Sequence, residues 1–192
     1  GSAATADDYA VVQPTSGGGR YILQSSAVPE TTTKRWVVVG PSCSAPLVAA
    51  TSLPAVGLAA AATAYIANTD ATGAAMTVYA SFNDFSPGDV ISEIELVGSL
   101  VNSTADVTAT FYLISSVDGA TSPVVTSMGS RTSPASAGVF TSSTAVGPYT
   151  VPAPTGHYSV VAEIVLTNTA GTSQDAKLNW VALNGTRSYI RE

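Results

Sequence analysis

The sequence predicts an all-β fold, an antiparallel β-sandwich of the jelly-roll type that follows an extended N-terminal arm. Three observations predict it. Charged residues make up only 10% of the chain, and the β-branched residues Val and Thr, which suit a pleated surface, are common. The 16 glycines and 11 prolines divide the chain into short segments. About eight of these segments read as strands separated by turns, which is typical of two packed sheets.

Residues 1–42 predict an arm that contains a β-hairpin. Two short apolar runs, residues 9–12 and 20–23, flank a turn sequence at residues 14–19 with three consecutive glycines. Two short strands are marginally stable on their own. We therefore expect the arm to pack between subunits, and residues 43–192 to form the sandwich.

Residues 57–68 are rich in alanine, and their secondary structure stays open between two alternatives. Alanine has the highest helix propensity, which favours a short helix. Residues 64–67 also read as a strand, because they precede the turn-forming sequence Asn-Thr-Asp.

The strands of the sandwich are predicted from alternation of apolar and polar positions. Five segments alternate in this way: residues 77–82, 91–100, 108–115, 158–167 and 177–183. In the third segment, Phe111 and Leu113 face one side and Tyr112 the other. Residues 123–128 predict a shorter strand. The apolar sides of these strands are large enough to form the core of one domain.

Residues 130–147 are rich in Ser, Thr, Ala and Gly and predict a long exposed loop with a strand fragment at Val139 and Phe140. Exposed aromatic rings beside such a loop are suited to contact with a ligand, since they combine a large apolar face with specific geometry. Phe140 and Tyr149 are therefore the candidate ligand-binding residues.

Charge and cysteine content exclude several classes of protein. The net charge is −6, with seven scattered basic residues, so we expect no nucleic-acid binding, which depends on Lys and Arg. The single Cys43 cannot form an intrachain disulfide or a zinc site by itself. Residues 44–69 carry no charge, but Pro46, Pro54 and Gly57 interrupt them, so we expect no membrane span.

Few side chains suggest a reaction centre. His157 is the only histidine and lies at the start of a predicted strand. Glu93 and Glu95 share one face of a strand at about 7 Å, which is within the range of an acid and base pair, but the alternation with Ile94 and Leu96 favours a solvent-facing stripe. Asp84 and Asp89 flank a Pro-Gly turn and offer oxygen ligands for calcium, although Asp is common in turns. We therefore predict no catalytic residue, metal site or cofactor, and no enzymatic activity.

Residues 7–23, with the sequence DDYAVVQPTSGGGRYIL, resemble a segment common in tail fibre, tailspike, head fibre, decoration and other virion appendage proteins of tailed bacteriophages. The shared pattern is Val-Val-x-Pro-x-x-Gly-x-Gly-Arg followed by an aromatic residue. The resemblance implies that an assembly or receptor-binding β domain follows, frequently a trimeric one. It implies no active site, because the matching residues are structural.

These observations together predict a non-enzymatic virion structural protein, exposed on the extracellular virion surface as a fibre, decoration or receptor-binding domain. The expected partners are further copies of the chain in a homotrimer, other virion proteins and a host surface glycan. The abundance of alanine at inward positions favours an oligomer, because small core residues leave a domain dependent on close-packed neighbours. Two alternatives stay open: a bacterial carbohydrate-binding or adhesin module, and a capsid or spike jelly roll of another virus.

Overall fold

The structure, a computed structural model, describes the chain in five ranges: residues 29–44, 55–58, 64–117, 122–151 and 156–190. The chain divides into two compact units, residues 33–187 and residues 1–32 together with 188–192. In the second unit only the strand ends at residues 29–32 and 188–190 are described. The first unit holds the two sheets on which the candidate site depends.

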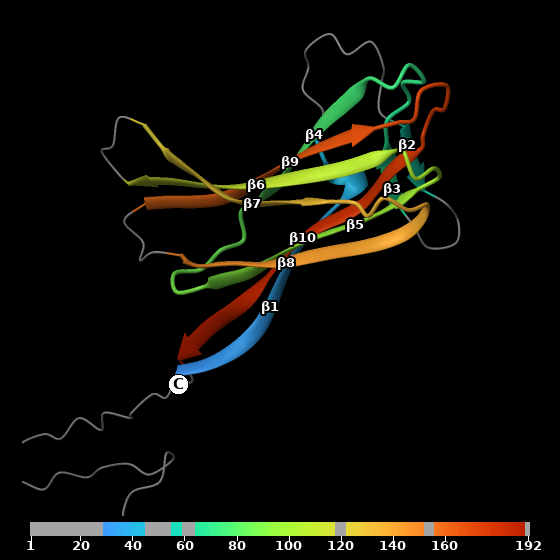
Figure 1. Cartoon of the computed structure of the whole chain (residues 1–192). Helices are drawn as coiled ribbons and strands as arrows, with labels where there is room; N and C mark the ends of the chain where they lie inside the picture. Colours follow the sequence, from blue (N-terminus) through green and yellow to red (C-terminus); the bar gives the residue numbers. More distant parts are fainter. Residues whose placement is uncertain (1–28, 45–54, 59–63, 118–121, 152–155, 191–192) are drawn as a thin grey trace, which may run out of the picture. The chain divides into compact units, whose positions relative to one another are not determined.

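Ten strands and one short 3₁₀ helix, η1 (Gly40–Ser42), make up the described part of the chain (Figure 1). The six-stranded sheet contains β1 (Pro29–Val39), β2 (Ala55–Leu58), β3 (Ala64–Ala67), β5 (Val90–Leu100), β8 (Gly138–Thr150) and β10 (Ala176–Ile190). The four-stranded sheet contains β4 (Ala75–Phe82), β6 (Asp106–Val117), β7 (Val124–Thr132) and β9 (Gly156–Thr167). Within the described residues, no helix has the length and apolar character that a membrane crossing needs.

The order of the strands is that of a jelly roll. It is β2-β3-β10-β5-β8 in the six-stranded sheet, where β1 also pairs with β10, and β4-β9-β6-β7 in the four-stranded sheet. From β3 to β10 the chain changes sheet at every connection except the β6–β7 hairpin. This winding brings distant strands together in two antiparallel layers, as in the double Greek key of a jelly roll. The predicted fold class is confirmed.

The core lies between the two sheets and follows the predicted period of two. On β9, Val160, Ala162 and Ile164 are buried, whereas Val161 and Glu163 between them are partly exposed. Each large side chain contributes about 1.5–3 kcal/mol when fully buried, before the entropy of ordering is subtracted. The largest fully buried side chains are Phe111, Ile66, Ile91, Ile94, Leu96, Ile164, Leu166, Leu178, Leu183, Val78, Val107 and Val160.

An ion pair closes the end of the sandwich where β4 leads into β5. Asp89 is fully buried and accepts hydrogen bonds from Nε and Nη2 of Arg187 at 2.9 and 2.8 Å. It also accepts the backbone N–H of Ser86 at 2.7 Å. Burial by itself raises the pKa of Asp89, but the bonds from Arg187 and Ser86 and the nearby positive charges outweigh it and keep this pKa below its ordinary value. The pair therefore ties β10 to the loop before β5.

The buried side-chain amides of Asn68 and Asn168 hold the opposite end of the sandwich, where β3 leads into β4. The Nδ2 of Asn68 donates to the backbone oxygen of Leu166 at 3.0 Å, and Asn168 donates to the backbone oxygen of Asn68 at 2.8 Å. The Oδ1 of Asn168 accepts the backbone N–H groups of Asp175 and Ala176, both at 3.0 Å. These bonds pair backbone groups of the loops that a ladder does not reach. They hold the loop between β3 and β4 against the loop between β9 and β10.

The prediction of a long exposed loop at residues 130–147 is wrong. Most of it belongs to β8, a 13-residue strand whose register with β5 runs from Gly138 to Thr150. Ser142 and Thr144 occupy inward positions on this strand, opposite Leu96 and Ile94. Because hydroxyl side chains replace apolar ones at those positions, the hydrophobic alternation that signals a strand is missing.

The two alternatives for residues 57–68 are settled where the structure describes them. Residues 55–58 and 64–67 are strands that pair with each other in antiparallel register, from Ala55–Ala67 to Leu58–Ala64. The hairpin predicted for the arm lies outside the described residues. Residues 33–42, which the sequence assigned to the arm, fall in the same unit as the sheets, and Trp36 among them packs into the core.

Candidate functional site

The two residues selected from the sequence as ligand contacts both pack toward the core. Phe140 is only 6% exposed. Its ring lies against Gly98, where an added Cβ would come within 2.8 Å of the Phe140 ring. The expectation that the Phe140 ring is exposed is therefore wrong, because the inward face of β8 carries it into the core. Tyr149 is partly buried and packs against the same core.

The carboxylate pair Glu93 and Glu95 is held by neighbouring side chains. Glu95 forms an ion pair with Arg35 and accepts the indole N–H of Trp180 at 3.2 Å. Asn184 donates to Glu93 at 3.0 Å and to Glu95 at 3.5 Å. The Glu95 side chain is only 12% exposed. The expected solvent-facing stripe is therefore a network that ties β1, β5 and β10 together.

The other polar candidates are also accounted for. Asp89 pairs with Arg187, and Asp84 with Lys34 at 3.2 Å. In the part of the chain that the structure describes, no group of three or more His, Cys, Asp or Glu side chains is placed to hold a metal ion. His157 is exposed on β9, where it pairs with Ser116.

The outer face of the four-stranded sheet carries Tyr79 and Tyr112. Cross-strand pairing puts Tyr79 of β4 beside Glu163 of β9, and Glu163 beside Thr110 of β6. The next outward row pairs Val161 with Tyr112. All five side chains are partly exposed. We call this surface the tyrosine platform, defined by Tyr79, Ser81, Thr110, Tyr112, Val161 and Glu163.

The two tyrosines of the platform are spaced for one extended ligand. They lie two strands apart and one outward repeat apart along the sheet. Strand spacing and rise put their Cα atoms about 12 Å apart. Glu163 and Val161 lie between them on β9. The platform therefore presents two rings on either side of a carboxylate and an apolar side chain.

Neither platform ring makes a ring–ring or cation–π contact within the described residues. Among the described residues, the ring–ring contacts join Trp36 with Phe85, Phe82 with Phe111 and Phe85 with Tyr158, and the cation–π contact joins Lys177 with Tyr65. Tyr79 and Tyr112 take part in none of these contacts. Their faces are therefore not engaged by an aromatic or cationic partner from the described part of the chain.

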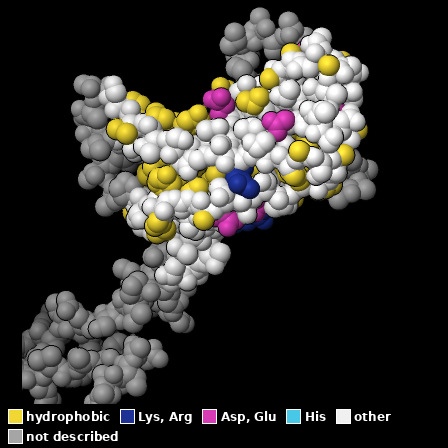
Figure 2. Space-filling model, viewed as in Figure 1, with side chains coloured by type: hydrophobic (Ala, Val, Ile, Leu, Met, Phe, Trp, Pro, Cys, Tyr) yellow, Lys and Arg dark blue, Asp and Glu magenta, His cyan; other side chains and the backbone are white. Residues whose placement is uncertain are grey.

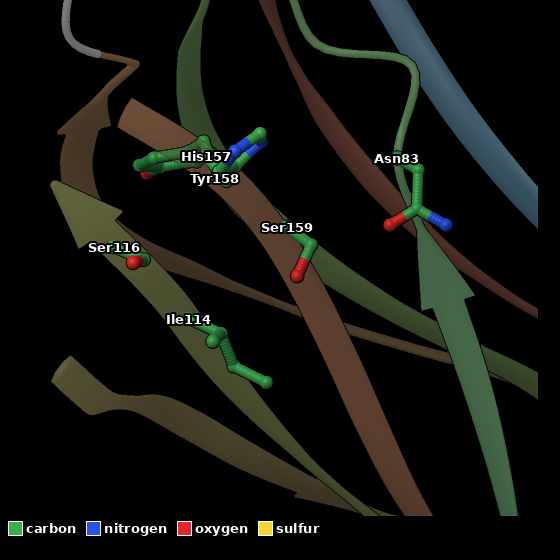
Figure 3. Close-up of a pocket in the computed structure, with 6 residues that line it drawn as sticks. All are labelled: Asn83, Ile114, Ser116, His157, Tyr158 and Ser159. Atoms are coloured by element: carbon green, nitrogen blue, oxygen red, sulfur yellow. The ribbon is translucent and has the colours of Figure 1, made fainter. Parts of the chain in front are cut away.

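A shallow pocket of about 380 Å³ continues the platform at one end (Figure 3). Three neighbouring strands supply its lining, with Asn83 just after β4, Ile114 and Ser116 from β6, and Ser159 with its neighbours from β9. Ile114 pairs directly with Ser159. The full lining is Asn83, Ile114, Ser116, His157, Tyr158 and Ser159. Amide, hydroxyl and imidazole groups thus surround one apolar side chain.

Positive charge is absent from the platform. The basic residues that the structure describes are engaged with other groups: Lys34, Arg35 and Arg187 in ion pairs, Lys177 over the Tyr65 ring, and Arg131 with Ser142. On the side of the molecule seen in Figure 2, a few Lys, Arg, Asp and Glu side chains lie among polar and apolar ones. A ligand on the six platform residues meets hydroxyls, rings, one apolar side chain and one carboxylate.

Sequence reasoning missed Tyr79 and Tyr112 as site residues, although the signal was present. The alternation that places Val78 and Ala80 inward also places Tyr79 outward, and the alternation at Phe111 places Tyr112 outward. In this chain the tyrosines at these outward positions of β4 and β6 are partly exposed, whereas Phe140 in the loop-like sequence is buried.

Comparison with known proteins gives only remote likenesses. No family model and no curated protein matches the sequence. Among solved structures, a CBM36-1 domain of a multidomain xylanase from the hindgut metagenome of Trinervitermes trinervoides matches with a TM-score of 0.43 and 13% identity, over 78% of this chain and 96% of that one.

Two larger proteins match over a part of their length. The CBM22-1–GH10 modules of Clostridium thermocellum xylanase 10B, complexed with xylohexaose, give a TM-score of 0.41 and 10% identity over 75% of this chain and 25% of that one. The enzymatically active domain of bacteriophage CBA120 tailspike protein 4 gives a TM-score of 0.40 and 12% identity over 83% of this chain and 19% of that one. With TM-scores below 0.5, these likenesses carry no argument about function, which depends on the site instead.

Proposed function

We propose that this chain is a non-catalytic carbohydrate-binding module that holds a glycan on the tyrosine platform. The observation that carries the proposal is the pair Tyr79 and Tyr112, two outward rings without aromatic or cationic partners among the described residues, on either side of Glu163. Rings of this kind give a ligand apolar contact at a small cost in conformational entropy.

The polar groups of the platform match the chemistry of a sugar. A pyranose has an apolar C–H face that packs on a ring and a rim of hydroxyls that need donors and acceptors. Glu163 is an acceptor between the rings, and Thr110 and Ser81 offer hydroxyls that both donate and accept. The platform therefore meets both requirements in one flat surface.

The proposal includes no reaction. A glycoside hydrolase needs two carboxyl groups that flank the bond it cleaves. Glu163 is the one carboxylate of the platform, and the pair Glu93 and Glu95 is engaged with Arg35, Trp180 and Asn184. Binding without cleavage is therefore the function that these side chains support.

An extracellular surface is the setting that this function requires, and we propose it for the chain. The virion position and the contacts with other virion proteins and a host glycan stay predictions, since residues 7–23 lie outside the described residues. Self-association also stays a prediction. Val124 and Val125, which are 62% and 58% exposed on the edge strand β7, favour it, because exposed apolar edges invite pairing with another chain.

Substitution of the two rings tests the proposed function. Affinity electrophoresis of the whole chain in gels that contain hydroxyethyl cellulose, xylan, mixed-linkage β-glucan, galactomannan, alginate or polygalacturonate would identify a retarding polymer. We expect Tyr79→Ala and Tyr112→Ala each to weaken binding by about 5–30-fold, the effect of about 1–2 kcal/mol.

The matched control is Tyr65→Ala, the same substitution on the outer side of the six-stranded sheet, where Lys177 lies over the ring at 4.9 Å. This variant should keep wild-type retardation. The proposal fails if none of the six polymers retards the wild-type chain, or if Tyr65→Ala loses as much binding as the platform variants. Near-ultraviolet circular dichroism of each variant shows whether its fold is intact.

A further inference from the structure

We propose that the glycan bound by the platform is an uncharged polysaccharide, and that Glu163 excludes polymers of acidic sugars. This inference rests on the proposed function and adds the chemical class of the ligand to it. Three features of the described residues carry it: the position of Glu163, the engagement of the basic residues with other groups, and a second carboxylate, Asp106, on the same face.

Glu163 has a central position on the platform. It lies in the row between Tyr79 and Thr110, and a ligand that contacts both tyrosines must pass over it. A hydroxyl can donate to this carboxylate, whereas a uronate or sulfate group would bring a like charge within a few ångströms of it. Like charges at that distance repel, and most strongly where a bound ligand has displaced water.

The described cations nearest this charge are engaged by other carboxylates: Lys34 and Arg35 line a pocket with Ser81 of the platform, but they pair with Asp84 and Glu95. Arg131 is on β7, but its guanidinium donates to Ser142 of β8 at 3.0–3.2 Å, on the inner side of its strand. The other described basic side chains are engaged with Asp84, Glu95, Asp89 or Tyr65. Proteins bind acidic groups with Arg and Lys, often in bidentate geometry. The platform contains no Arg or Lys side chain, and it contains the carboxylate of Glu163 instead.

Asp106 extends the same sign of charge along the outer face. It lies on β6, where it pairs with Thr167 of β9, and its oxygens accept hydrogen bonds from Thr108 and Ser133 at 3.0 and 2.9 Å. The pocket at the opposite end has no carboxylate in its lining. Two carboxylates, Glu163 and Asp106, therefore lie on the outer face of this sheet, and the net charge of −6 has the same sign.

The test compares uncharged and acidic polymers at two ionic strengths. We expect binding to at least one of hydroxyethyl cellulose, xylan, β-glucan and galactomannan, with equal strength at about 10 mM and about 150 mM NaCl. At the lower salt concentration, where repulsion is least screened, we expect alginate and polygalacturonate to bind at least about tenfold more weakly than the uncharged polymer that binds. Tight binding of an acidic polymer would overturn the inference and leave the proposed function standing. Failure of every polymer to bind would overturn the proposed function itself.

Substitutions that reverse or remove the charge of Glu163 provide a second test of the inference. Glu163→Lys should gain binding to alginate and polygalacturonate by at least about tenfold at low salt, and Glu163→Gln should narrow the difference between the two classes of polymer. Asp84→Lys is the matched control, since it makes the same change of charge at an exposed side chain outside the platform. The inference is wrong if Asp84→Lys gains as much binding as Glu163→Lys, or if neither Glu163 variant changes the discrimination.

Discussion

On the outer face of the six-stranded sheet, Trp180 and Tyr65 contact polar or charged side chains. Trp180 donates its indole N–H to Glu95, and Lys177 lies over the Tyr65 ring. On the outer face of the four-stranded sheet, Tyr79 and Tyr112 have no aromatic or cationic partner among the described residues. Both faces carry aromatic residues, and they differ in what each ring contacts.

Outward aromatic residues of a β-sandwich fall into two cases, according to what their rings contact. Val97 is buried although it faces outward, because its cross-strand neighbour is Trp180. An aromatic residue that shields its neighbours stabilises the sheet through cross-strand packing. One that shields little and has no polar partner is available to a ligand. Residue type alone does not separate the two cases, and the contacts do.

The largest expected effect comes from removing one ring on each face. Trp180→Ala should lower the free energy of unfolding by about 3 kcal/mol, at the low end for Trp→Ala because the ring is partly exposed. Tyr112→Ala should lower it by about 1 kcal/mol or less, the size of one cross-strand pair. Urea denaturation followed by circular dichroism measures both. Equal losses in the two variants would mean that the faces do not differ as described.

A carboxylate on each face gives a smaller and sharper comparison. Glu95→Ala leaves Arg35 and the indole N–H of Trp180 without their acceptor, and should cost about 2 kcal/mol of unfolding free energy. Glu163→Ala removes a side chain with no intramolecular hydrogen bond among the described residues, and should change it by less than about 0.5 kcal/mol. The same urea titrations apply, in 0.15 M salt so that surface charge is screened. A Glu163 variant as unstable as the Glu95 variant would show that the platform is a structural network.

Much of the fold could be predicted from the sequence because the core strands alternate in hydrophobicity. β4, β5, β6, β9 and β10 all carry that pattern, and turns rich in Gly, Pro and Asp separate several of them. β8 was missed because Ser142 and Thr144 occupy its inward positions. A strand at the edge of a sheet covers less core, so polar residues are tolerated there and the sequence signal disappears.

The site was less predictable, because it depends on which strands become neighbours. Tyr79 and Tyr112 are far apart in the sequence, and only the order β4-β9-β6 brings them to one surface with Glu163 between them. Strand order is a long-range property that local alternation does not encode. The same is true of Glu95, whose partners Arg35 and Trp180 come from β1 and β10.

The smallest expected effect concerns Tyr158, which lies on β9 beneath the pocket and packs its ring edge-on against Phe85. Its hydroxyl is buried and has no hydrogen-bond partner among the described residues. Tyr158→Phe removes a group whose desolvation is not compensated, so the free energy of unfolding at neutral pH should stay unchanged or rise by up to about 1 kcal/mol. Glycan binding should be unchanged, because the ring is directed to the core side of β9.

Alkaline pH separates this variant from the wild type. Burial, with a smaller contribution from Tyr149, raises the pKa of Tyr158 to about 12. Since an unfolded tyrosine ionises near pH 10, the unfolded state of the wild type loses this proton first, and the stability that the neutral form contributes is lost as pH rises from about 10 to about 12. Tyr158→Phe lacks this loss, so urea midpoints at pH 7 and at about pH 11 should differ less in the variant than in the wild type. An equal difference between the two pH values in the wild type and the variant would mean that the Tyr158 hydroxyl is solvated in the folded state. The pocket would then reach deeper toward the core than the platform does.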